Sequence, residues 1–230
     1  MIRLFRRALK TIDRAYVRFM IVRHGFWFVD IPRTSSSSIR SELGKRFGKA
    51  HGKRNIIEKE HSSNQFLPDH MPAREMRDFL GHSKWNRIFT FTVVRNPWDR
   101  ICSMYHYRRK MGNIPGAWGF RDYVLALGKA SLKNEYFSYH GYRYGASKYV
   151  LGEDGEIIVD FIAKYENRLH DLQLIASRLN FRELGQLHIQ SAAPRNRNYS
   201  EFYDSETREI IRSLYKEDIE LFDYKFDEKA

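Results

Sequence analysis

The feature of this sequence that most constrains its fold is the stretch Phe26–Phe47, where a strand pattern passes through a short polar loop into a helix pattern. Aromatic and β-branched residues dominate Phe26–Ile31, whereas Ile39, Leu43 and Phe47 recur at helical spacing. The intervening loop, PRTSSSS, contains one fixed cation, five hydroxyl groups and the backbone N–H groups that open a helix. All of these groups favour a bound oxyanion, so the stretch predicts a strand, a phosphate- or sulfate-binding loop and a helix.

The candidate anion ligands in this loop are consecutive residues, namely Arg33, Thr34, Ser35, Ser36, Ser37 and Ser38. A serine-rich run is often a flexible linker, but this one is confined between a strand pattern and a helix pattern. The nucleotide-binding signature GxxxxGK[ST] is absent, because Gly25 is the only glycine between His24 and Gly44 and the loop has no lysine. We therefore expect an anion-binding loop that serves a donor other than ATP.

A second strand-to-helix junction follows the strand pattern of Arg87–Val94. Asn96 is a suitable N-cap and Pro97 suits the first helical position. Ser103 follows Arg95 by eight positions and lies about two turns inside the expected helix, on the face of its cap. A phosphate held jointly by a guanidinium and a hydroxyl fits this spacing. The alternative is an ordinary surface arginine and a serine bonded to its own helix backbone.

The rest of the chain alternates between strand and helix patterns. We expect helices at 72–80, 97–110, 120–127, 167–179 and 205–222, and a strand at 157–166. Apolar residues at helical spacing, including Leu169 and Leu214, are expected to face the core. Such alternation predicts a single α/β domain over 25–230, with a mostly parallel sheet whose ligands bind at the carboxyl ends of the strands.

Residues 1–24 form a separate basic and amphipathic segment. Its apolar residues share one face of a helix, and they are Ile2, Phe5, Leu9, Ile12, Tyr16 and Phe19. The favoured interpretation is a helix whose apolar face packs on the core, as in surface helices of soluble domains. The alternative is peripheral contact with an anionic membrane surface.

Composition restricts the partners and the compartment. The chain has 40 Lys and Arg against 28 Asp and Glu, a net charge of +12, which favours anionic partners. Cys102 is the only cysteine, so no internal disulfide can form. We expect it to be a small buried hydrophobe. No stretch matches a membrane span or a signal peptide, and a cytoplasmic protein is expected.

Two motifs in this sequence resemble those of the sulfotransferases that use 3'-phosphoadenosine 5'-phosphosulfate. PRTSSSS at 32–38 is similar to their 5'-phosphosulfate loop, and FTVVRNPWDRICSMYHY at 91–107 is similar to their 3'-phosphate motif. The resemblance is closest to the carbohydrate branch, which includes heparan sulfate and chondroitin 2-O-sulfotransferases and short bacterial members. It extends through HMPAREM at 70–76, VDFIAKYEN at 159–167 and the segment 199–224.

The resemblance implies a P-loop-like, three-layer α/β fold and sulfuryl transfer to a hydroxyl of a carbohydrate acceptor, anionic or lipid-linked. No metal is implied. By position, Arg33–Ser38 would bind the 5'-phosphosulfate, with Arg33 stabilising the leaving phosphate, and Arg95 and Ser103 would bind the 3'-phosphate. His70 matches the catalytic histidine of the 2-O branch and would be the general base. A loop that closes over the nucleotide would contribute Ser191, Arg195 and Arg197.

This chain departs from the family pattern at three positions. Arg33 stands where the family usually has lysine, Ser35 occupies a glycine or alanine position, and Pro68 replaces a second histidine. Arginine stays protonated, so Arg33 can stabilise charge but is a poor proton donor. Asp69, beside His70, is an alternative base.

Two other classes of function are compatible with parts of this sequence. A kinase-like enzyme is disfavoured by the missing P-loop lysine and glycines and by the lack of paired magnesium carboxylates. A nucleic-acid-binding protein would use the positive charge and the 16 Phe, 14 Tyr and 4 Trp side chains. Most of these aromatic residues fall in apolar patterns, which indicates a core instead.

Overall fold

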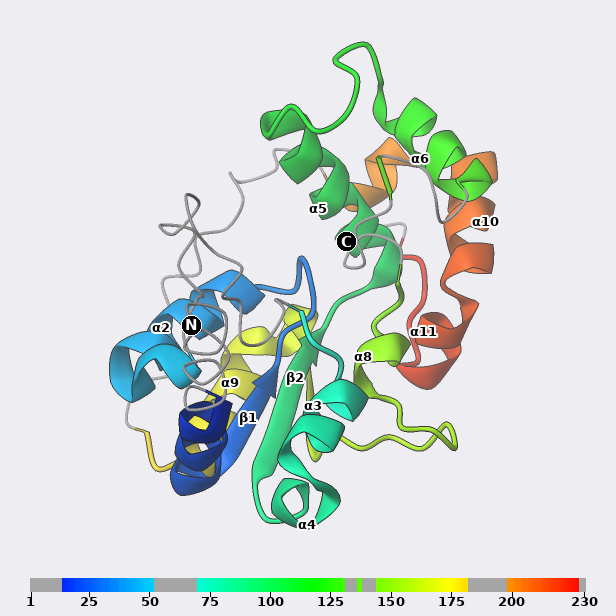
Figure 1. The fold of residues 1–230 in the computed structure, drawn as a ribbon. Coiled ribbons are helices and arrows are strands. Elements are labelled where there is room, and N and C mark those ends of the chain that lie inside the picture. Colours follow the sequence, from blue (N-terminus) through cyan, green and yellow to red (C-terminus); the bar gives the residue numbers. More distant parts are fainter. Residues whose placement is uncertain (1–13, 52–69, 131–135, 138–143, 182–197, 228–230) are drawn as a thin grey trace, which may run out of the picture.

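The computed structural model describes residues 14–51, 70–130, 136–137, 144–181 and 198–227 (Figure 1). Within these ranges a three-stranded sheet has the order β1-β2-β3, and its strands are β1 (Phe26–Val29), β2 (Phe89–Val94) and β3 (Phe161–Lys164). Both pairs of neighbouring strands are parallel, so their carboxyl ends lie at the same end of the sheet. The expected α/β fold with a parallel sheet is confirmed.

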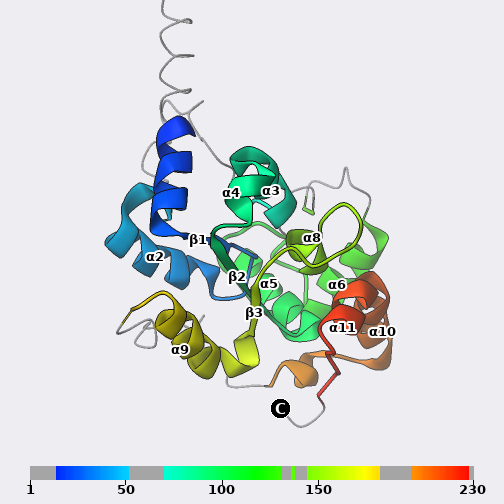
Figure 2. The ribbon, with the colours of Figure 1, turned by 90° about the horizontal axis from the view of Figure 1, so that it is seen from below.

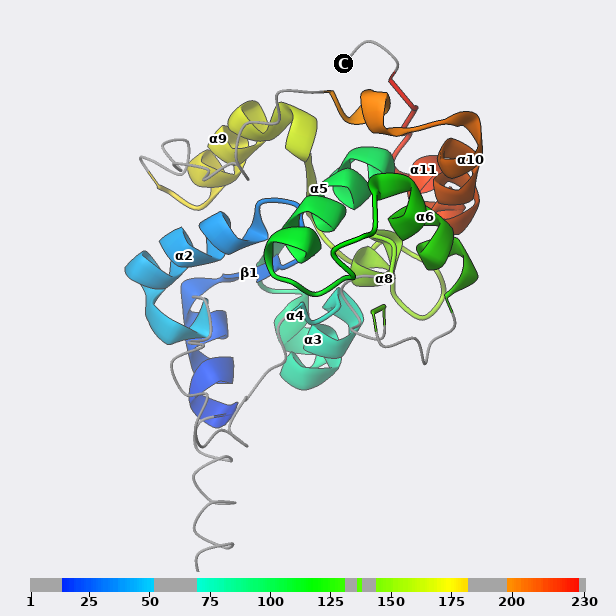
Figure 3. The ribbon, with the colours of Figure 1, turned by 90° about the horizontal axis from the view of Figure 1, so that it is seen from above.

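Helices cover both faces of the sheet (Figures 2 and 3). On one face, α2 (Ser36–Phe47) and α9 (Arg168–Arg178) pack against Phe26 and Phe28. On the other face, the helix of residues 14–24, α3 (Ala73–Leu80) and α4 (His82–Trp85) pack against Trp27 and Val29. Every residue of β1 is therefore buried, which explains its unbroken apolar sequence FWFV.

Besides the clusters on the two faces of the sheet, a third hydrophobic cluster lies beyond the carboxyl end of β2. There α5 (Pro97–Lys110) packs with α6 (Phe120–Lys129) and α10 (Ser205–Leu214). Cys102 is fully buried in this cluster, as expected for a small hydrophobe. The shorter elements are η1 (Gly48–Ala50), α8 (Ser147–Val150), η3 (Tyr165–Asn167), η5 (Tyr199–Phe202) and α11 (Lys216–Leu221).

The third strand is shorter than the sequence pattern indicates. It begins at Phe161, whereas Ile157 is 47% exposed and forms an isolated antiparallel bridge with Leu151. The side chain of Asp160 then accepts hydrogen bonds from the backbone N–H and the hydroxyl of Thr90 in β2. The chain thus pairs with its own preceding residues before it joins the sheet, which the apolar pattern does not reveal.

The expected helix at 205–222 is divided in two. It breaks at Tyr215 between α10 and α11, and Asp218 is then buried, where it accepts hydrogen bonds from the backbone N–H groups of Ala146 (2.5 Å) and Ser147 (2.9 Å). These tertiary bonds fix the direction of α11. The expectation that Leu169 and Leu214 face the core is wrong, because they are 59% and 41% exposed.

The end of the N-terminal segment lies within the described residues. Residues 14–24 are helical. Ile21 is buried in the hydrophobic cluster that includes Trp27 and Val29, and Val17 packs against that cluster. Tyr16 and Phe19 are instead 56% and 58% exposed, so the expectation that their face packs on the core is wrong. The packed face is offset around the helix from the predicted stripe. Among the described residues, no helix is long and apolar enough to cross a membrane.

Candidate active site

The loop after β1 has an unusual backbone. Arg33 and Ser35 have φ angles of 68° and 71°, in the left-handed region where non-glycine residues are uncommon. The Thr34 side chain is fully buried and its hydroxyl donates to the carbonyl of Ile31 at 2.9 Å, which closes the turn. Tight turns of this kind expose successive N–H groups to an anion. The left-handed φ of Ser35 is a conformation that glycine adopts without steric cost.

The second junction forms as its sequence predicts. Asn96 caps α5, and its side chain accepts a hydrogen bond from the N–H of Trp98 at 3.1 Å, with Pro97 at the first helical position. Arg95 is buried, with its Nε 2.6 Å from an Asp99 carboxylate oxygen and its guanidinium 3.9 Å from the ring centroid of Tyr165. These contacts hold Arg95 in one orientation beside the helix N-terminus.

The two junctions meet at one place. The Nη2 of Arg33 donates to the hydroxyl of Ser103 at 3.2 Å, and its Nε lies 3.4 Å from the same oxygen. The Nη1 of Arg95 donates to the carbonyl of Arg33 at 3.1 Å. The guanidinium of Arg33 also lies over the ring of Tyr107, 4.5 Å from its centroid. Because β1 and β2 are parallel neighbours, their following loops bring two cations and a buried hydroxyl together, as an anionic ligand requires.

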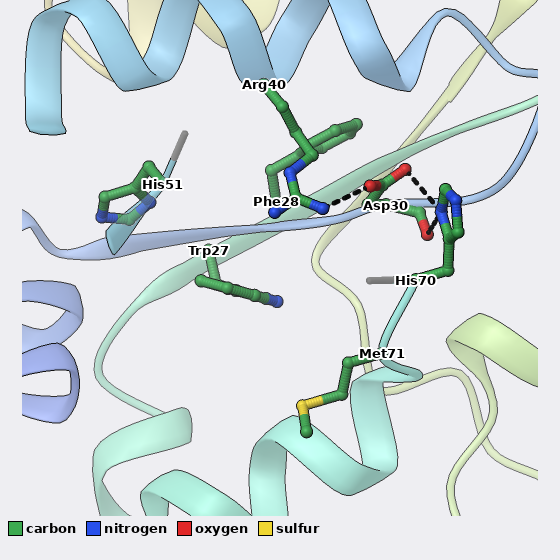
Figure 4. Close-up of a pocket in the computed structure, with 7 residues that line it drawn as sticks. All are labelled: Trp27, Phe28, Asp30, Arg40, His51, His70 and Met71. Carbon is green, nitrogen blue, oxygen red and sulfur yellow. Dashed lines mark hydrogen bonds and ion pairs between the residues drawn. The ribbon is translucent and has the colours of Figure 1, made fainter. Parts of the chain in front are cut away.

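His70 joins the end of β1 from a distant part of the sequence. Its Nδ1 lies 3.0 Å from one carboxylate oxygen of Asp30 and 3.2 Å from the Asp30 main-chain carbonyl (Figure 4). The other carboxylate oxygen accepts a hydrogen bond from Nη1 of Arg40, in α2, at 2.7 Å. The three side chains line a pocket together with Trp27, Phe28, His51 and Met71.

Asp30 is ionised at neutral pH despite its burial. Burial raises the pKa of its carboxyl, but the hydrogen bond and charge of His70 and the charge of Arg40 outweigh burial and lower that pKa to about 2. The opposite end of the pocket is uncharged, because burial and the neighbouring His24 lower the pKa of His51 to about 3. The charge in this pocket is therefore concentrated at the Asp30 end.

The structure gathers most of the predicted site residues and adds others. Arg33, in the loop from Arg33 to Ser38, contacts Ser103 of the second junction, and His70 contacts Asp30, which lies between β1 and this loop. Ser36 is buried and Ser37 is exposed. Five residues named in the sequence analysis lie outside the described ranges, so their roles stay predictions. They are Pro68, Asp69, Ser191, Arg195 and Arg197.

Sequence reasoning missed Asp30, whose carboxylate faces His70, and Arg40, which donates to the same carboxylate. A signal for Asp30 was present, since a carboxylate interrupts the apolar run at the end of a strand, where parallel sheets bind ligands. Within the ranges that the structure describes, no group of three or more His, Cys, Asp or Glu side chains is arranged to hold a metal ion.

A parallel α/β sheet whose two strand-to-helix junctions gather cations and hydroxyls at its carboxyl end is typical of enzymes that bind phosphorylated ligands. The chain belongs to the sulfotransferase family, whose model matches residues 17–225. It is therefore an enzyme that transfers a sulfuryl group. It is also similar to an uncharacterized protein of Archaeoglobus fulgidus, with 26% identity over 126 residues that make up 55% of this chain and 96% of that protein. No solved structure matches the chain.

Proposed function

We propose that this sulfotransferase moves a sulfuryl group from 3'-phosphoadenosine 5'-phosphosulfate to a hydroxyl of a carbohydrate. The observation that supports the proposal most is the contact between the junctions, where Arg33 donates to Ser103 and Arg95 donates to the carbonyl of Arg33. A donor with anionic groups at two ends needs two such sites close together. The family membership of the chain supports the same reaction.

The residues at the two junctions fit this donor. The loop from Arg33 to Ser38 opens the twelve-residue helix α2, and we assign the 5'-phosphosulfate to it. Arg95 and Ser103, both buried, are assigned to the 3'-phosphate. Ser191, Arg195 and Arg197 are proposed to close over the nucleotide. The donor supplies the sulfuryl group and leaves as adenosine 3',5'-bisphosphate.

The protein's own groups supply charge stabilisation and proton transfer. The guanidinium of Arg33 has five N–H donors, so it can contact a phosphate while it keeps its bond to Ser103. It stabilises the leaving phosphate without donating a proton. His70 is proposed to accept the proton of the attacking hydroxyl, a contribution of about 10² to 10⁴ in rate. The proposal involves no metal ion, because these cations and helix N–H groups already face the developing charge.

The charge of the chain and its exposed N-terminal side chains bear on the acceptor. A net charge of +12 favours an anionic glycan or a lipid-linked glycan at an anionic surface. Tyr16 and Phe19 are exposed on the helix of residues 14–24, among the basic side chains of Arg14, Arg18 and Arg23. Aromatic and basic residues side by side are typical of helices that contact a membrane surface. These features support peripheral membrane contact through the N-terminal helix.

A transfer assay tests this function. The purified full chain is incubated with donor that carries ³⁵S and with a panel of capsular, glycosaminoglycan-like and lipid-linked glycans. The proposal expects label in at least one glycan and release of adenosine 3',5'-bisphosphate in equal amount. Calorimetry then compares that nucleotide with ATP. Tighter binding of ATP, with no label transferred, would contradict the proposal and favour a kinase-like enzyme.

A further inference from the structure

Asp30 stands where the strand bearing the anion-binding loop ends, and its carboxylate has a separate partner on each oxygen. One oxygen faces Nδ1 of His70 at 3.0 Å, and the other accepts from Nη1 of Arg40 at 2.7 Å. Only 7% of Asp30 is exposed, so both contacts are shielded from solvent. The Asp30 carboxylate is thus held by a hydrogen bond from Arg40 and lies at ion-pair distance from the imidazole, whose hydrogen bond is to the Asp30 main-chain carbonyl (Figure 4).

The contacts of His70 determine which ring nitrogen carries the proton. Its Nδ1 faces two groups that can only accept hydrogen bonds, the ionised Asp30 carboxylate and the Asp30 carbonyl at 3.2 Å. The neutral imidazole therefore carries its proton on Nδ1. Its lone pair is then on Nε2, on the opposite edge of the ring.

We propose that Asp30 is a positioning residue for His70, holding the Nδ1–H tautomer and the ring orientation so that Nε2 is the base of the transfer. This inference rests on the proposed function of His70. It assigns Asp30 no contact with the substrate. Its carboxylate also stabilises the imidazolium that forms in the reaction, as an adjacent negative charge does.

One proton and one sulfuryl group move in the transfer. The acceptor oxygen forms its bond to sulfur while its proton passes to Nε2 of His70. The bond between sulfur and the donor's phosphate oxygen breaks, and its electron pair stays on that oxygen beside Arg33. The imidazolium returns its proton to solvent before the next turnover, and Asp30 remains ionised throughout because its pKa is about 2.

The other groups around the pair do not replace Asp30 in this role. Arg40 is the charged group that faces the carboxylate from α2, and its positive charge opposes rather than favours an imidazolium. Ser36, also in α2, is a neutral group that helps to lower the pKa of the Asp30 carboxyl. His51 lines the same pocket and is neutral, since its pKa is about 3. Among the described residues, Asp30 is thus the negative charge that faces His70.

The first test measures the tautomer in the wild-type protein. Long-range ¹⁵N–¹H NMR of the full-length protein at neutral pH reports the tautomer of each histidine, and His70→Gln assigns the His70 signals. We expect the His70 ring with its proton on Nδ1. A ring protonated on Nε2 in the wild type would overturn the proposal.

The second test substitutes Asp30→Asn, which keeps the size of the side chain and removes its charge. We expect a kcat at least about tenfold lower, which is part of the 10² to 10⁴ that a general base supplies. The midpoint of the His70 titration should move to lower pH, and the Kd for adenosine 3',5'-bisphosphate should stay within about twofold. The control is Glu42→Gln on the same helix as Arg40, because Glu42 pairs only with the exposed Lys45 and Arg46 among the described residues. An unchanged titration midpoint and kcat in Asp30→Asn would overturn the inference.

These readouts separate this inference from the proposed function. If no acceptor is sulfated but the Nδ1–H tautomer and the dependence of its titration on Asp30 are found, the transfer assignment fails. If transfer occurs but the Asp30→Asn variant keeps the wild-type tautomer and titration midpoint, the positioning role of Asp30 fails.

Discussion

The Nη1 of Arg95 donates a hydrogen bond to the main-chain carbonyl of Arg33 across 3.1 Å and 62 residues of sequence. This bond joins the loops that follow two neighbouring parallel strands. It ties the loop at Arg33 to the junction that bears Arg95 and Ser103. A ligand that contacts one junction therefore lies within reach of the other, which is the basis for assigning both to one nucleotide.

Ser103→Ala should weaken the binding of nucleotides that carry a 3'-phosphate. The hydroxyl is buried and is contacted by Arg33, and a hydrogen bond of this type contributes about 0.5–1.5 kcal/mol, or about two- to twelvefold in affinity. Calorimetry should show this loss with adenosine 3',5'-bisphosphate and no loss with adenosine 5'-phosphate. Equal losses with both nucleotides would place Ser103 elsewhere than at the 3'-phosphate.

Arg33→Lys should also weaken binding, although the charge is retained. Lysine cannot contact Ser103 through two nitrogens, and it loses the planar stacking of the guanidinium on Tyr107. We expect a several-fold higher Kd for adenosine 3',5'-bisphosphate. Lys45→Arg on the exposed face of α2 is the matched control and should bind as the wild type does. Unchanged affinity in Arg33→Lys would show that the fork of arginine has no function in binding.

His70→Ala should separate chemistry from binding. Loss of the base should lower kcat by about 10² to 10⁴, whereas the Kd for adenosine 3',5'-bisphosphate should change by less than about twofold. Steady-state transfer assays and calorimetry on the same preparation give both values. The opposite pattern, normal kcat with weakened nucleotide binding, would move His70 from the acceptor side to the nucleotide side.

Acid stability should depend on Asp30. Its pKa is lowered from an ordinary 3.8 to about 2, so the unfolded state binds more protons than the folded state between these values. The contacts of ionised Asp30 with His70 and Arg40 thus stabilise the fold by roughly 2 kcal/mol above about pH 4. This stability is lost as the pH falls toward 2. Urea unfolding at pH 7, 4 and 3 should show the gap between wild type and Asp30→Asn narrowing toward low pH. A gap that stays constant would contradict the assignment.

The parts of the fold that sequence predicted depend on local signals. The strand, loop and helix of Phe26–Phe47 and the cap at Asn96 follow from residues adjacent in the chain. Periodicity does not determine how far an apolar stripe extends around a helix, which is why Leu169 and Leu214 are exposed. The break at Tyr215 depends on bonds from Asp218 to residues 71 and 72 positions away, and no local pattern encodes them.

The candidate site likewise has a part that the sequence predicts and a part that depends on tertiary packing. Both junctions were predictable because each is a motif of contiguous residues, and the parallel sheet then determines that they meet. His70 and Asp30 are 40 residues apart in the sequence. Arg40, in α2, contacts the carboxylate of Asp30. Such a contact depends on tertiary packing, so the sequence could nominate His70 but not its partners.

The central claim is that both junctions hold a single nucleotide, and calorimetry of Arg95→Ala with adenosine 3',5'-bisphosphate tests it most directly. Arg121→Ala, which removes an exposed arginine paired with Asp204, is the control. Loss of a charge-assisted contact of about 1.5–3 kcal/mol should raise the Kd by about ten- to 150-fold in Arg95→Ala alone. A folded Arg95→Ala protein that binds this nucleotide as tightly as the wild type would contradict the claim.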